Sequence, residues 1–320
     1  MKFLAGLSLC FFAVAVHAFV SNAPLHAYDF PRRLFNSLDT RAPVSSLANR
    51  GPKSRNRSSY HGRATVKCMG DTVWSKVRKE TDGLAAATDQ HSLTIKAGDI
   101  PKGYQVPGQF VQIRVGAEGK PGFFAIASAP PKPNQGGEDL LEFLIKDNES
   151  TKPLISSKPG DEVEMSPVMG KGFPVTENFS GYKYDFPVQN VVLIATGTGI
   201  APLRAAIESG ILELPDEEDD GVFGRSCRLY WGCKDEESMP WVDKLKEWEA
   251  KNVEVIPVLS EPSDSWTGRT GFIQEAIKKD GIRVPRNSGI LVCGHQEMVV
   301  DAKAIASSAG VLEGRVLTNF

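Results

Sequence analysis

A glycine-rich segment in the second half of the sequence has the composition of an anion-binding turn. Residues 197–202 are Gly-Thr-Gly-Ile-Ala-Pro and follow the apolar run 191–195 after one residue, Thr196. Glycine lets backbone N–H groups approach an anion, and the N-terminus of a helix favours negative charge. Because the segment follows a predicted buried strand and opens a predicted helix, it indicates a site for the pyrophosphate of a nucleotide. The predicted binding residues are Gly197, Thr198, Gly199, Ile200 and Pro202.

A second candidate for chemistry begins at Cys293, in the sequence Cys-Gly-His-Gln-Glu-Met. It follows the apolar run 289–292, and ligands of parallel sheets bind at the carboxyl ends of the strands. A small, soft side chain at that place can border a reactive ring, so Cys293 is a candidate together with Gly294 and Met298. A buried small apolar residue is the alternative for Cys293, and a turn residue is the alternative for His295.

The elements that must position these residues differ between the two halves of the chain. Over residues 71–187, short apolar segments alternate with Gly- and Pro-containing turns and no helical periodicity interrupts them, which predicts an antiparallel β-barrel. Over residues 188–320, strands alternate with helices, which predicts an α/β domain with a doubly wound parallel sheet. A polar linker is predicted over 176–189. The predicted helices are Ala201 to Leu212, Pro240 to Lys251, Phe272 to Lys279 and Gln296 to Ser308.

Length and charge are consistent with two domains behind a removable leader. The chain has 320 residues, enough for about two domains, and its 41% apolar residues and five cysteines exclude a disordered or disulfide-scaffold protein. The net charge of −2 hides an asymmetry. Residues 19–70 carry nine Lys and Arg against two Asp and Glu, whereas residues 71–320 carry 27 against 37. The acidic body argues against nucleic-acid binding.

The N-terminal residues have the features of targeting sequences. Residues 1–18 combine a positive charge at Lys2, an apolar run and a small residue at Ala18, which predicts a signal peptide. Residues 19–70 are rich in Arg, Ser, Asn and Pro, which predicts a plastid transit peptide. A signal peptide followed directly by an aromatic residue, here Phe19, resembles the bipartite presequences of algae with secondary plastids. The predicted location is therefore the plastid stroma, and the alternative is a secreted protein with a basic pro-segment.

Cysteine usage favours the plastid over secretion. Cys227, Cys233 and Cys293 are an odd set without a Cys-x-x-Cys pair, whereas a secreted domain more often has an even disulfide set. The sequence lacks a cysteine cluster for zinc or an iron–sulfur centre, so no metal is predicted. No segment after residue 71 has the apolar length of a membrane span.

The combination of barrel, Gly-Thr-Gly-Ile-Ala-Pro and a late Cys-Gly-x-x-x-Met resembles the ferredoxin-NADP reductase superfamily of flavin-dependent pyridine-nucleotide oxidoreductases. Closer similarity is to the plant plastid FAD/NAD(P)-binding oxidoreductases known as fruit-protein-like sequences. It lies in the segments 107–112, 126–130 and 166–173 and in the ending Leu-Thr-Asn-Phe at 317–320. The resemblance covers residues 72–320. It implies an FAD-binding barrel over 71–187, an NAD(P)-binding domain over 188–320, and FAD with NADH or NADPH as cofactors.

The flavin signature of that family, Arg-x-Tyr-Ser, falls on residues 122–125, which are Gly-Phe-Phe-Ala. The resemblance implies that Phe124 stacks on the flavin ring. The Arg that pairs with flavin phosphate is replaced by Gly122, and the hydroxyl that reaches flavin N5 is missing at Ala125. Barrel core is the alternative for Phe123 and Phe124, because neighbours in a strand alternate faces.

The phosphate contact must then come from elsewhere in the barrel. Lys146, or the hydroxyls and backbone N–H groups of Ser150 and Thr151, would supply it. The flavin-binding residues that the resemblance implies are Phe124, Ala125, Ile126, Ala127, Ser128, Lys146, Ser150 and Thr151.

On the pyridine-nucleotide side the resemblance implies two reactive-centre residues, Cys293 and the C-terminal Phe320, which matches an aromatic residue near the flavin in relatives. The end of an edge strand is the alternative for Phe320. Where NADPH-specific relatives have Ser-Arg, this chain has Ser260 and Glu261, and a carboxylate repels a 2′-phosphate. Lys234 could offset that repulsion in part. The carboxylate of Glu261 nevertheless favours NADH over NADPH as the nucleotide. The other implied nucleotide residues are Thr198, Gly199, Pro202, Gly294 and Met298.

These features predict a soluble plastid flavoprotein in which NAD(P)H binds across the interdomain cleft. Orientation of the nicotinamide toward the flavin, rather than acid–base chemistry, would supply most of the rate of hydride transfer. Reduced flavin would pass electrons to an unidentified acceptor. A partner protein guided by the acidic surface is one such acceptor, although solubility alone accounts for that charge. The alternative function is a catalytically weakened flavin- or nucleotide-binding module with a regulatory or scaffolding role, suggested by Gly122 and Ala125.

Overall fold

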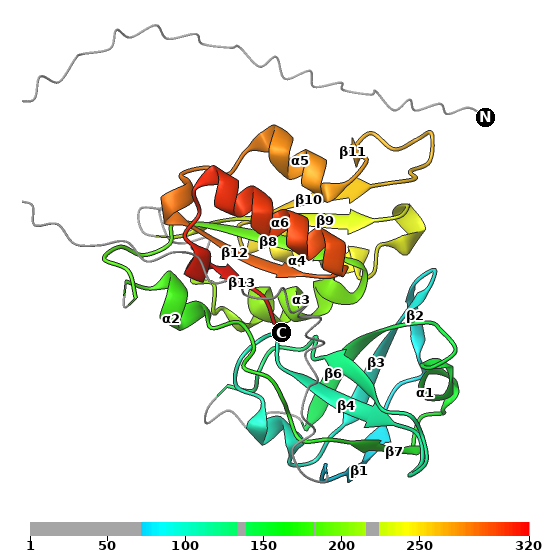
Figure 1. Cartoon of the computed structure of the whole chain (residues 1–320). Helices are drawn as coiled ribbons and strands as arrows, with labels where there is room; N and C mark the ends of the chain where they lie inside the picture. The colour runs from blue at the N-terminus through cyan, green and yellow to red at the C-terminus, as the bar shows by residue number, and fades with distance from the viewer. Residues whose placement is uncertain (1–71, 133–138, 182, 216–223, 320) are drawn as a thin grey trace, which may run out of the picture. The chain divides into compact units, whose positions relative to one another are not determined.

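The computed structural model describes residues 72–132, 139–181, 183–215 and 224–319. The predicted signal peptide, the predicted transit peptide and Phe320 lie outside these residues. Two sheets follow one another along the described chain, as Figure 1 shows. The first sheet is antiparallel and the second is parallel, which confirms the predicted fold class.

The first sheet has seven strands in the order β2-β3-β1-β7-β4-β5, with β6 paired to β3. An isolated bridge between Ile126 and Phe143 brings the chain after β5 beside β6, so the sheet curls toward a barrel. The strands are β1 (Ser75–Lys79), β2 (Leu84–Ala87), β3 (Gln90–Lys96), β4 (Phe110–Arg114), β5 (Gly122–Ala125), β6 (Leu140–Lys146) and β7 (Glu162–Met165).

Period-two alternation places the barrel core. Ile95, Val111, Phe143 and Val163 come from four different strands, and all are buried in one cluster. Their strand neighbours face the other way, and one of them, Leu144, is buried in the core of the second domain. Two one-turn helices interrupt the strands, η1 (Ile100–Gly103) and α1 (Lys152–Ser156). Neither helix was predicted, because a single turn is too short to show a helical period. Each has a proline in its first turn, where proline is tolerated.

The second sheet has six parallel strands in the order β11-β10-β9-β8-β12-β13. The strand order reverses between β8 and β12, so the carboxyl ends of these two neighbours form the switch point where such sheets bind ligands. The strands are β8 (Asn190–Thr196), β9 (Ser226–Cys233), β10 (Val253–Leu259), β11 (Arg269–Thr270), β12 (Ser288–Cys293) and β13 (Val316–Leu317).

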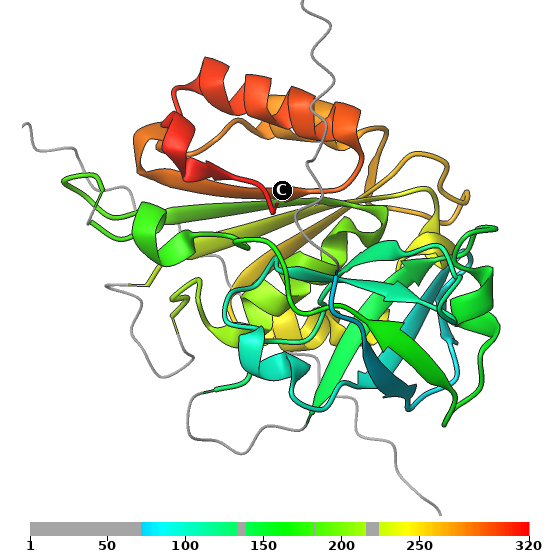
Figure 2. The same cartoon turned by 60° about the horizontal axis from the view of Figure 1, so that its bottom comes forward.

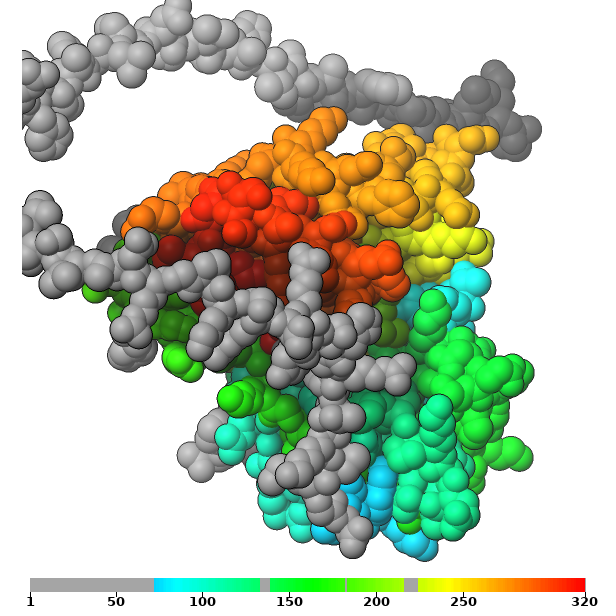
Figure 3. All heavy atoms as spheres, viewed as in Figure 1, coloured from blue at the N-terminus to red at the C-terminus, as the bar shows by residue number. Residues whose placement is uncertain are grey.

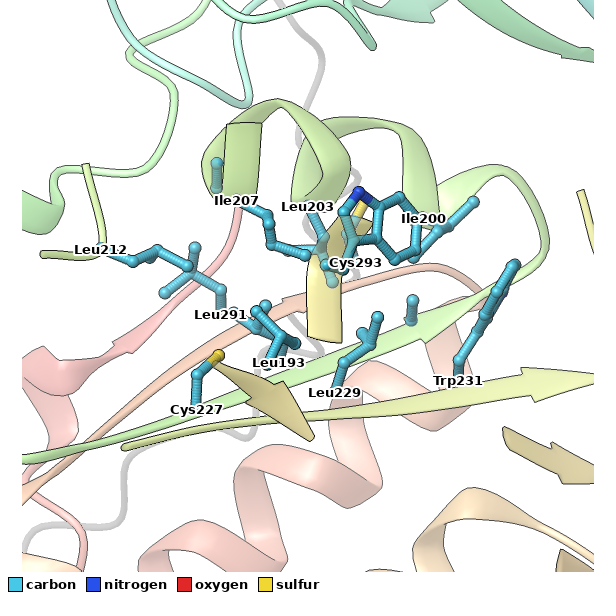
Figure 4. Packing of buried hydrophobic residues seen from close by; sticks show 14 of the residues in the cluster. Leu193, Ile200, Leu203, Ile207, Leu212, Cys227, Leu229, Trp231, Leu291 and Cys293 are labelled. Carbon is cyan, nitrogen blue, oxygen red and sulfur yellow. The ribbon is translucent and has the colours of Figure 1, made fainter. Parts of the chain in front are cut away.

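Helices cover both faces of this sheet, as Figure 2 shows. Leu193 and Leu291 face α3 (Ile200–Ser209) in one buried cluster, drawn in Figure 4, and α4 (Leu245–Ala250) packs on the same side. Their neighbours Val192 and Ile290 face α5 (Ile273–Asp280) and α6 (Gln296–Ala309) in a second cluster. Figure 3 shows α5 and α6 at the outer surface, in orange and red. Burial on both faces explains why these strands are continuous apolar runs.

Two predicted helices differ at their ends. The helix predicted to end at Leu212 stops at Ser209, because Gly210 adopts the left-handed conformation that ends helices. The helix predicted from Pro240 begins only at Leu245, since Trp241 has a φ of 57° and a 3-10 turn, η4 (Val242–Lys244), precedes it. Further 3-10 turns are η2 (Gly197–Gly199), η3 (Glu236–Ser238), η5 (Pro285–Asn287) and η6 (Glu313–Arg315).

The predicted polar linker over 176–189 is wrong in part. It overlaps α2 (Val175–Phe179), and the ring of Phe179 is fully buried against Gly289 of β12. Helix α2 is therefore anchored in the core of the second domain, through Phe179. Among the helices that the structure describes, none has the length and apolar character needed to cross a membrane.

Candidate functional site

The two glycine-containing loops predicted from the sequence lie against each other at the switch point. A methyl group on Gly199 would lie 2.2 Å from the carbonyl oxygen of Cys293, and one on Gly294 would lie 2.1 Å from Thr196 Oγ1. The backbone N–H of His295 donates to Thr196 Oγ1 at 2.9 Å. Only glycine fits at 199 and 294, because the two strand ends approach at backbone distance.

Two cavities meet at these loops. The sheet-side cavity, of about 490 Å³, lies over the carboxyl ends of β8, β9, β10 and β12. The barrel-side cavity, of about 530 Å³, lies between the loops and strand β5 of the barrel. They share four lining residues, namely Lys146, Thr196, Gly197 and His295. The cavities are therefore contiguous, and a ligand in one can touch a ligand in the other.

The barrel-side cavity is bordered by two aromatic residues of β5. Phe123 is 64% exposed and its ring packs edge-on against Phe110, with ring centroids 5.9 Å apart. Phe124 is half-buried and packs partly against the barrel core. Sequence reasoning assigned a stacking role to Phe124, whereas the structure gives the more exposed ring to Phe123. Alternation of strand neighbours predicts only one of the two rings on the cavity side, so it could not indicate that both residues border the cavity.

The start of β5 has no room for the arginine of the flavin signature. A Cβ added to Gly122 would lie 2.7 Å from the ring of Phe124. The aromatic side chain thus fills the space above residue 122, and a longer side chain there requires Phe124 to move.

The residues after Ala125 do not line the cavity as predicted. Ile126 and Ala127 are fully buried, Ile126 among the barrel residues and Ala127 in the core of the second domain. Ser128 Oγ accepts from the backbone N–H of Glu142 at 3.2 Å. The chain turns inward after Ala125, so of the predicted residues 124–128 only Phe124 and Ala125 border the barrel-side cavity, which Lys146 and Thr151 also border.

The predicted phosphate-binding hydroxyls have partners within their own loop. Ser150 donates from Oγ to Asn148 Oδ1 at 2.6 Å, and its backbone N–H donates to the same oxygen at 3.0 Å. Thr151 Oγ donates to the carbonyl oxygen of Lys146 at 2.6 Å. The ammonium of Lys146 is exposed and 3.3 Å from Asp89. Lys146 lines both cavities, so it is the better candidate for an anionic group.

At the far end of the sheet-side cavity, the predicted pair Ser260 and Glu261 follows β10. Their backbone N–H groups donate to the carbonyl oxygens of Cys233 and Lys234, which fixes the turn. Glu261 Oε2 lies 3.5 Å from Lys234 Nζ, in an exposed ion pair. Ser260 and Lys234 line the cavity, as do the predicted Gly197 and Met298.

Cys293 stands at the floor of the barrel-side cavity and is nearly buried. Burial raises the pKa of its thiol to about 12, so the thiol is protonated at neutral pH and is not a nucleophile. Its Sγ donates to Asn319 Oδ1 at 3.3 Å. Asn319 borders the same cavity. Sequence reasoning used the segment Leu-Thr-Asn-Phe only as a resemblance and did not single out Asn319.

The other predicted residues of the glycine-rich turn divide into cavity and core. Thr198 and Gly199 line the barrel-side cavity, whereas Ile200 and Pro202 are buried in the first turns of α3. The buried pair anchors the helix N-terminus beneath the loop. Within the described residues, there is no group of three metal-ligating side chains.

Comparison with known proteins agrees with this geometry. Residues 193–304 match the model of the oxidoreductase NAD-binding domain family. The chain is 34% identical to fruit protein pKIWI502 of Actinidia deliciosa over 257 residues, which are 77% of this chain and 76% of that protein. It is 25% identical to NADH-cytochrome b5 reductase 1 of Emericella nidulans, over 72% of this chain and 74% of that one.

Solved structures share the fold. A ferredoxin NADP+ reductase from Neisseria gonorrhoeae with bound FAD and NADP superposes with a TM-score of 0.60 at 18% identity, covering 77% of this chain and 97% of that one. The cytochrome b5 reductase domain of Ulva prolifera nitrate reductase superposes with a TM-score of 0.61 at 15% identity, with the same coverage.

Proposed function

Because this chain belongs to the ferredoxin-NADP reductase superfamily and is a relative of fruit protein pKIWI502, we propose that it transfers hydride between NAD(P)H and FAD. It is an oxidoreductase of the ferredoxin reductase and cytochrome b5 reductase type. The single observation that carries the proposal is the meeting of the two cavities at Thr196, Gly197 and His295. A flavin in one and a nicotinamide in the other would be in contact there.

The barrel-side cavity fits a flavin ring. Phe123 and Phe124 offer aromatic surface, and Ala125 leaves space beside them. The unpaired amide nitrogen of Asn319 indicates that the ligand has a polar group. Lys146 is placed for the phosphates. When bound, FAD supplies a ring that accepts a hydride and returns electrons singly or in pairs.

The glycine-rich turn and the sheet-side cavity fit a pyridine nucleotide. Gly197 lines both cavities, and the turn opens helix α3, whose N-terminus favours the negative charge of a phosphate. The neutral thiol of Cys293 borders the reacting rings without adding a charge. Binding and orientation are thus the contributions of these side chains, and no side chain is required as a nucleophile.

Glu261 supports a preference for NADH. Its carboxylate stands at the turn after β10, beside the cavity residue Ser260, and its charge opposes a 2′-phosphate. The ion pair with Lys234 engages the nearby cation that could otherwise attract that phosphate. NADH is therefore the proposed donor, and the acceptor is a small molecule or a partner protein.

A regulatory or scaffolding module is the second candidate, because the ring of Phe124 occupies the space where the family has its phosphate-binding arginine. Anaerobic titration of the purified, FAD-reconstituted protein with NADH and then with NADPH distinguishes the two. Bleaching of the flavin band at 1 equivalent or near it supports the oxidoreductase. A bound flavin that neither nucleotide reduces supports the module.

The proposed location is the plastid stroma, on the basis of the composition of residues 1–18 and 19–70. A fusion of residues 1–70 to a fluorescent protein tests it in an alga with secondary plastids. Plastid fluorescence is expected, and fluorescence in the medium would instead indicate secretion.

A further inference from the structure

Asn319 carries a buried side-chain amide at the junction of the two domains. Asn319 is 3% exposed, and its Nδ2 has no hydrogen-bond partner among the residues that the structure describes. An unpaired buried donor has lost its bonds to water without gaining others, so native proteins rarely leave one without a ligand or water. Asn319 borders the barrel-side cavity, so its carboxamide lies beside any molecule that binds there.

The orientation of this amide is fixed from two sides. The thiol of Cys293 donates to Oδ1 at 3.3 Å, which directs Nδ2 away from the sheet. On the barrel side, Gly108 leaves room for the side chain, because a methyl group there would lie 3.1 Å from Asn319 Cβ and 2.8 Å from the ring of Phe173. The donor is therefore held in place before any ligand binds, which reduces the entropic cost of binding.

The same end of the cavity lacks the hydroxyl that relatives are expected to use. Ala125 stands where the flavin signature has Ser, and it borders the barrel-side cavity with Asn319. Ala125 pairs with Phe110 in the sheet. Phe110 lies two residues after Gly108, and Gly108 is the residue packed beside Asn319. The missing hydroxyl and the unpartnered amide therefore belong to one corner of the site.

We propose that Asn319 donates the hydrogen bond to flavin N5 that the alanine at position 125 cannot make. Cys293 acts through Asn319 as a positioning residue, because its thiol sets which way the carboxamide faces. This inference rests on the proposed function, since it requires that the barrel-side cavity hold a flavin. It assigns to the C-terminal segment a contact with the ring itself.

The test compares FAD with 5-deaza-FAD, in which a C–H group replaces N5 and cannot accept a hydrogen bond. Dissociation constants of both are measured by fluorescence titration, without turnover. The wild-type protein is expected to bind FAD roughly three- to tenfold more tightly than 5-deaza-FAD, the range of one neutral hydrogen bond. Asn319→Leu is expected to bind the two flavins equally, while its affinity for NADH in the absence of flavin stays within about twofold of wild type.

A rescue variant separates donation from packing. Ala125→Ser in the Asn319→Leu background supplies a hydroxyl at the same corner and is expected to restore the preference for FAD. Asn319→Asp keeps the shape of the side chain, replaces the donor by a carboxylate and is expected to abolish the preference. It serves as the second variant if the leucine variant does not fold.

The outcomes are distinguishable from failure of the proposed function. A wild-type protein that binds both flavins equally, or an Asn319→Leu protein that keeps the wild-type preference, overturns this inference and leaves the proposed function standing. A wild-type protein that binds neither flavin overturns the proposed function and this inference with it.

Discussion

The guanidinium of Arg204 lies 2.6 Å from the carboxylate of Glu142 and joins helix α3 of the nucleotide-binding domain to strand β6 of the barrel. Arg204 also contacts Glu208 at 2.9 Å, and its guanidinium lies 4.5 Å from the centre of the Trp241 ring. Because α3 begins at the glycine-rich turn and β6 ends at Lys146, this buried cation connects the two sides of the site.

Arg204→Met is expected to destabilise the protein by about 2–4 kcal/mol. The substitution keeps much of the aliphatic volume but leaves two carboxylates without their shared partner in a largely buried environment. Unfolding in urea, followed by tryptophan fluorescence, measures the effect. Lys76→Met is the matched control, because its ion pair with Glu162 is exposed and contributes little. Equal effects of the two variants would contradict a structural role for Arg204.

Gly199→Ala is expected to abolish tight NADH binding and to lower stability by about 1–3 kcal/mol. The added Cβ would lie 2.2 Å from a backbone oxygen of Cys293, so the loops at the ends of β8 and β12 must separate. Isothermal titration with NADH and urea unfolding measure both effects.

Gly210→Ala is the matched control for that substitution. Gly210 has a φ of 78° but no atom within 4 Å of an added Cβ, so the cost is that of a left-handed alanine, about 1 kcal/mol. Its NADH affinity should equal that of wild type. Loss of NADH binding in this control would show that stability alone, rather than the loop contact, governs binding.

The sequence predicted what depends on local pattern and missed what depends on tertiary contact. The glycine-rich turn and the Cys-Gly turn could be placed together, because continuous apolar strands imply a parallel sheet with its loops at one edge. The ion pair between Arg204 and Glu142 could not be predicted, since Glu142 is 62 residues away in another domain. The unpartnered amide of Asn319 was likewise invisible, because a donor is satisfied or orphaned only by its neighbours in the folded chain.

Alkaline pH is expected to destabilise the protein through its buried thiols. Burial raises the pKa of Cys233 to about 12 and raises that of Cys227 as well, from an ordinary value of 9.0. Above pH 9 the unfolded chain loses these protons while the folded chain keeps them. Stability is therefore fully present below pH 9 and falls as pH rises toward the folded-state pKa, by up to about 1.4 kcal/mol per pH unit for each thiol.

Cys227→Ala measures the share of one thiol in that decline. Between pH 9 and 10.5, its free energy of unfolding should fall less steeply than that of wild type, by about 1 kcal/mol per pH unit. The absolute stability of the variant is lower because a small cavity remains, but only the slope is compared. Parallel slopes for the two proteins would indicate that Cys227 ionises equally in both states.

Glu261→Gln is expected to shift nucleotide preference toward NADPH. The substitution removes the carboxylate that repels a 2′-phosphate and frees Lys234, now 3.5 Å from Glu261, to attract it. Because both side chains are exposed and screened, the gain in kcat/KM for NADPH should be modest, roughly fivefold. The value for NADH should change less than twofold, since NADH has no phosphate at that position. Glu254→Gln removes another exposed carboxylate, the partner of Arg228, and should leave the NADPH-to-NADH ratio unchanged. A ratio that moves equally in both variants would trace the preference to overall surface charge instead of the turn after β10.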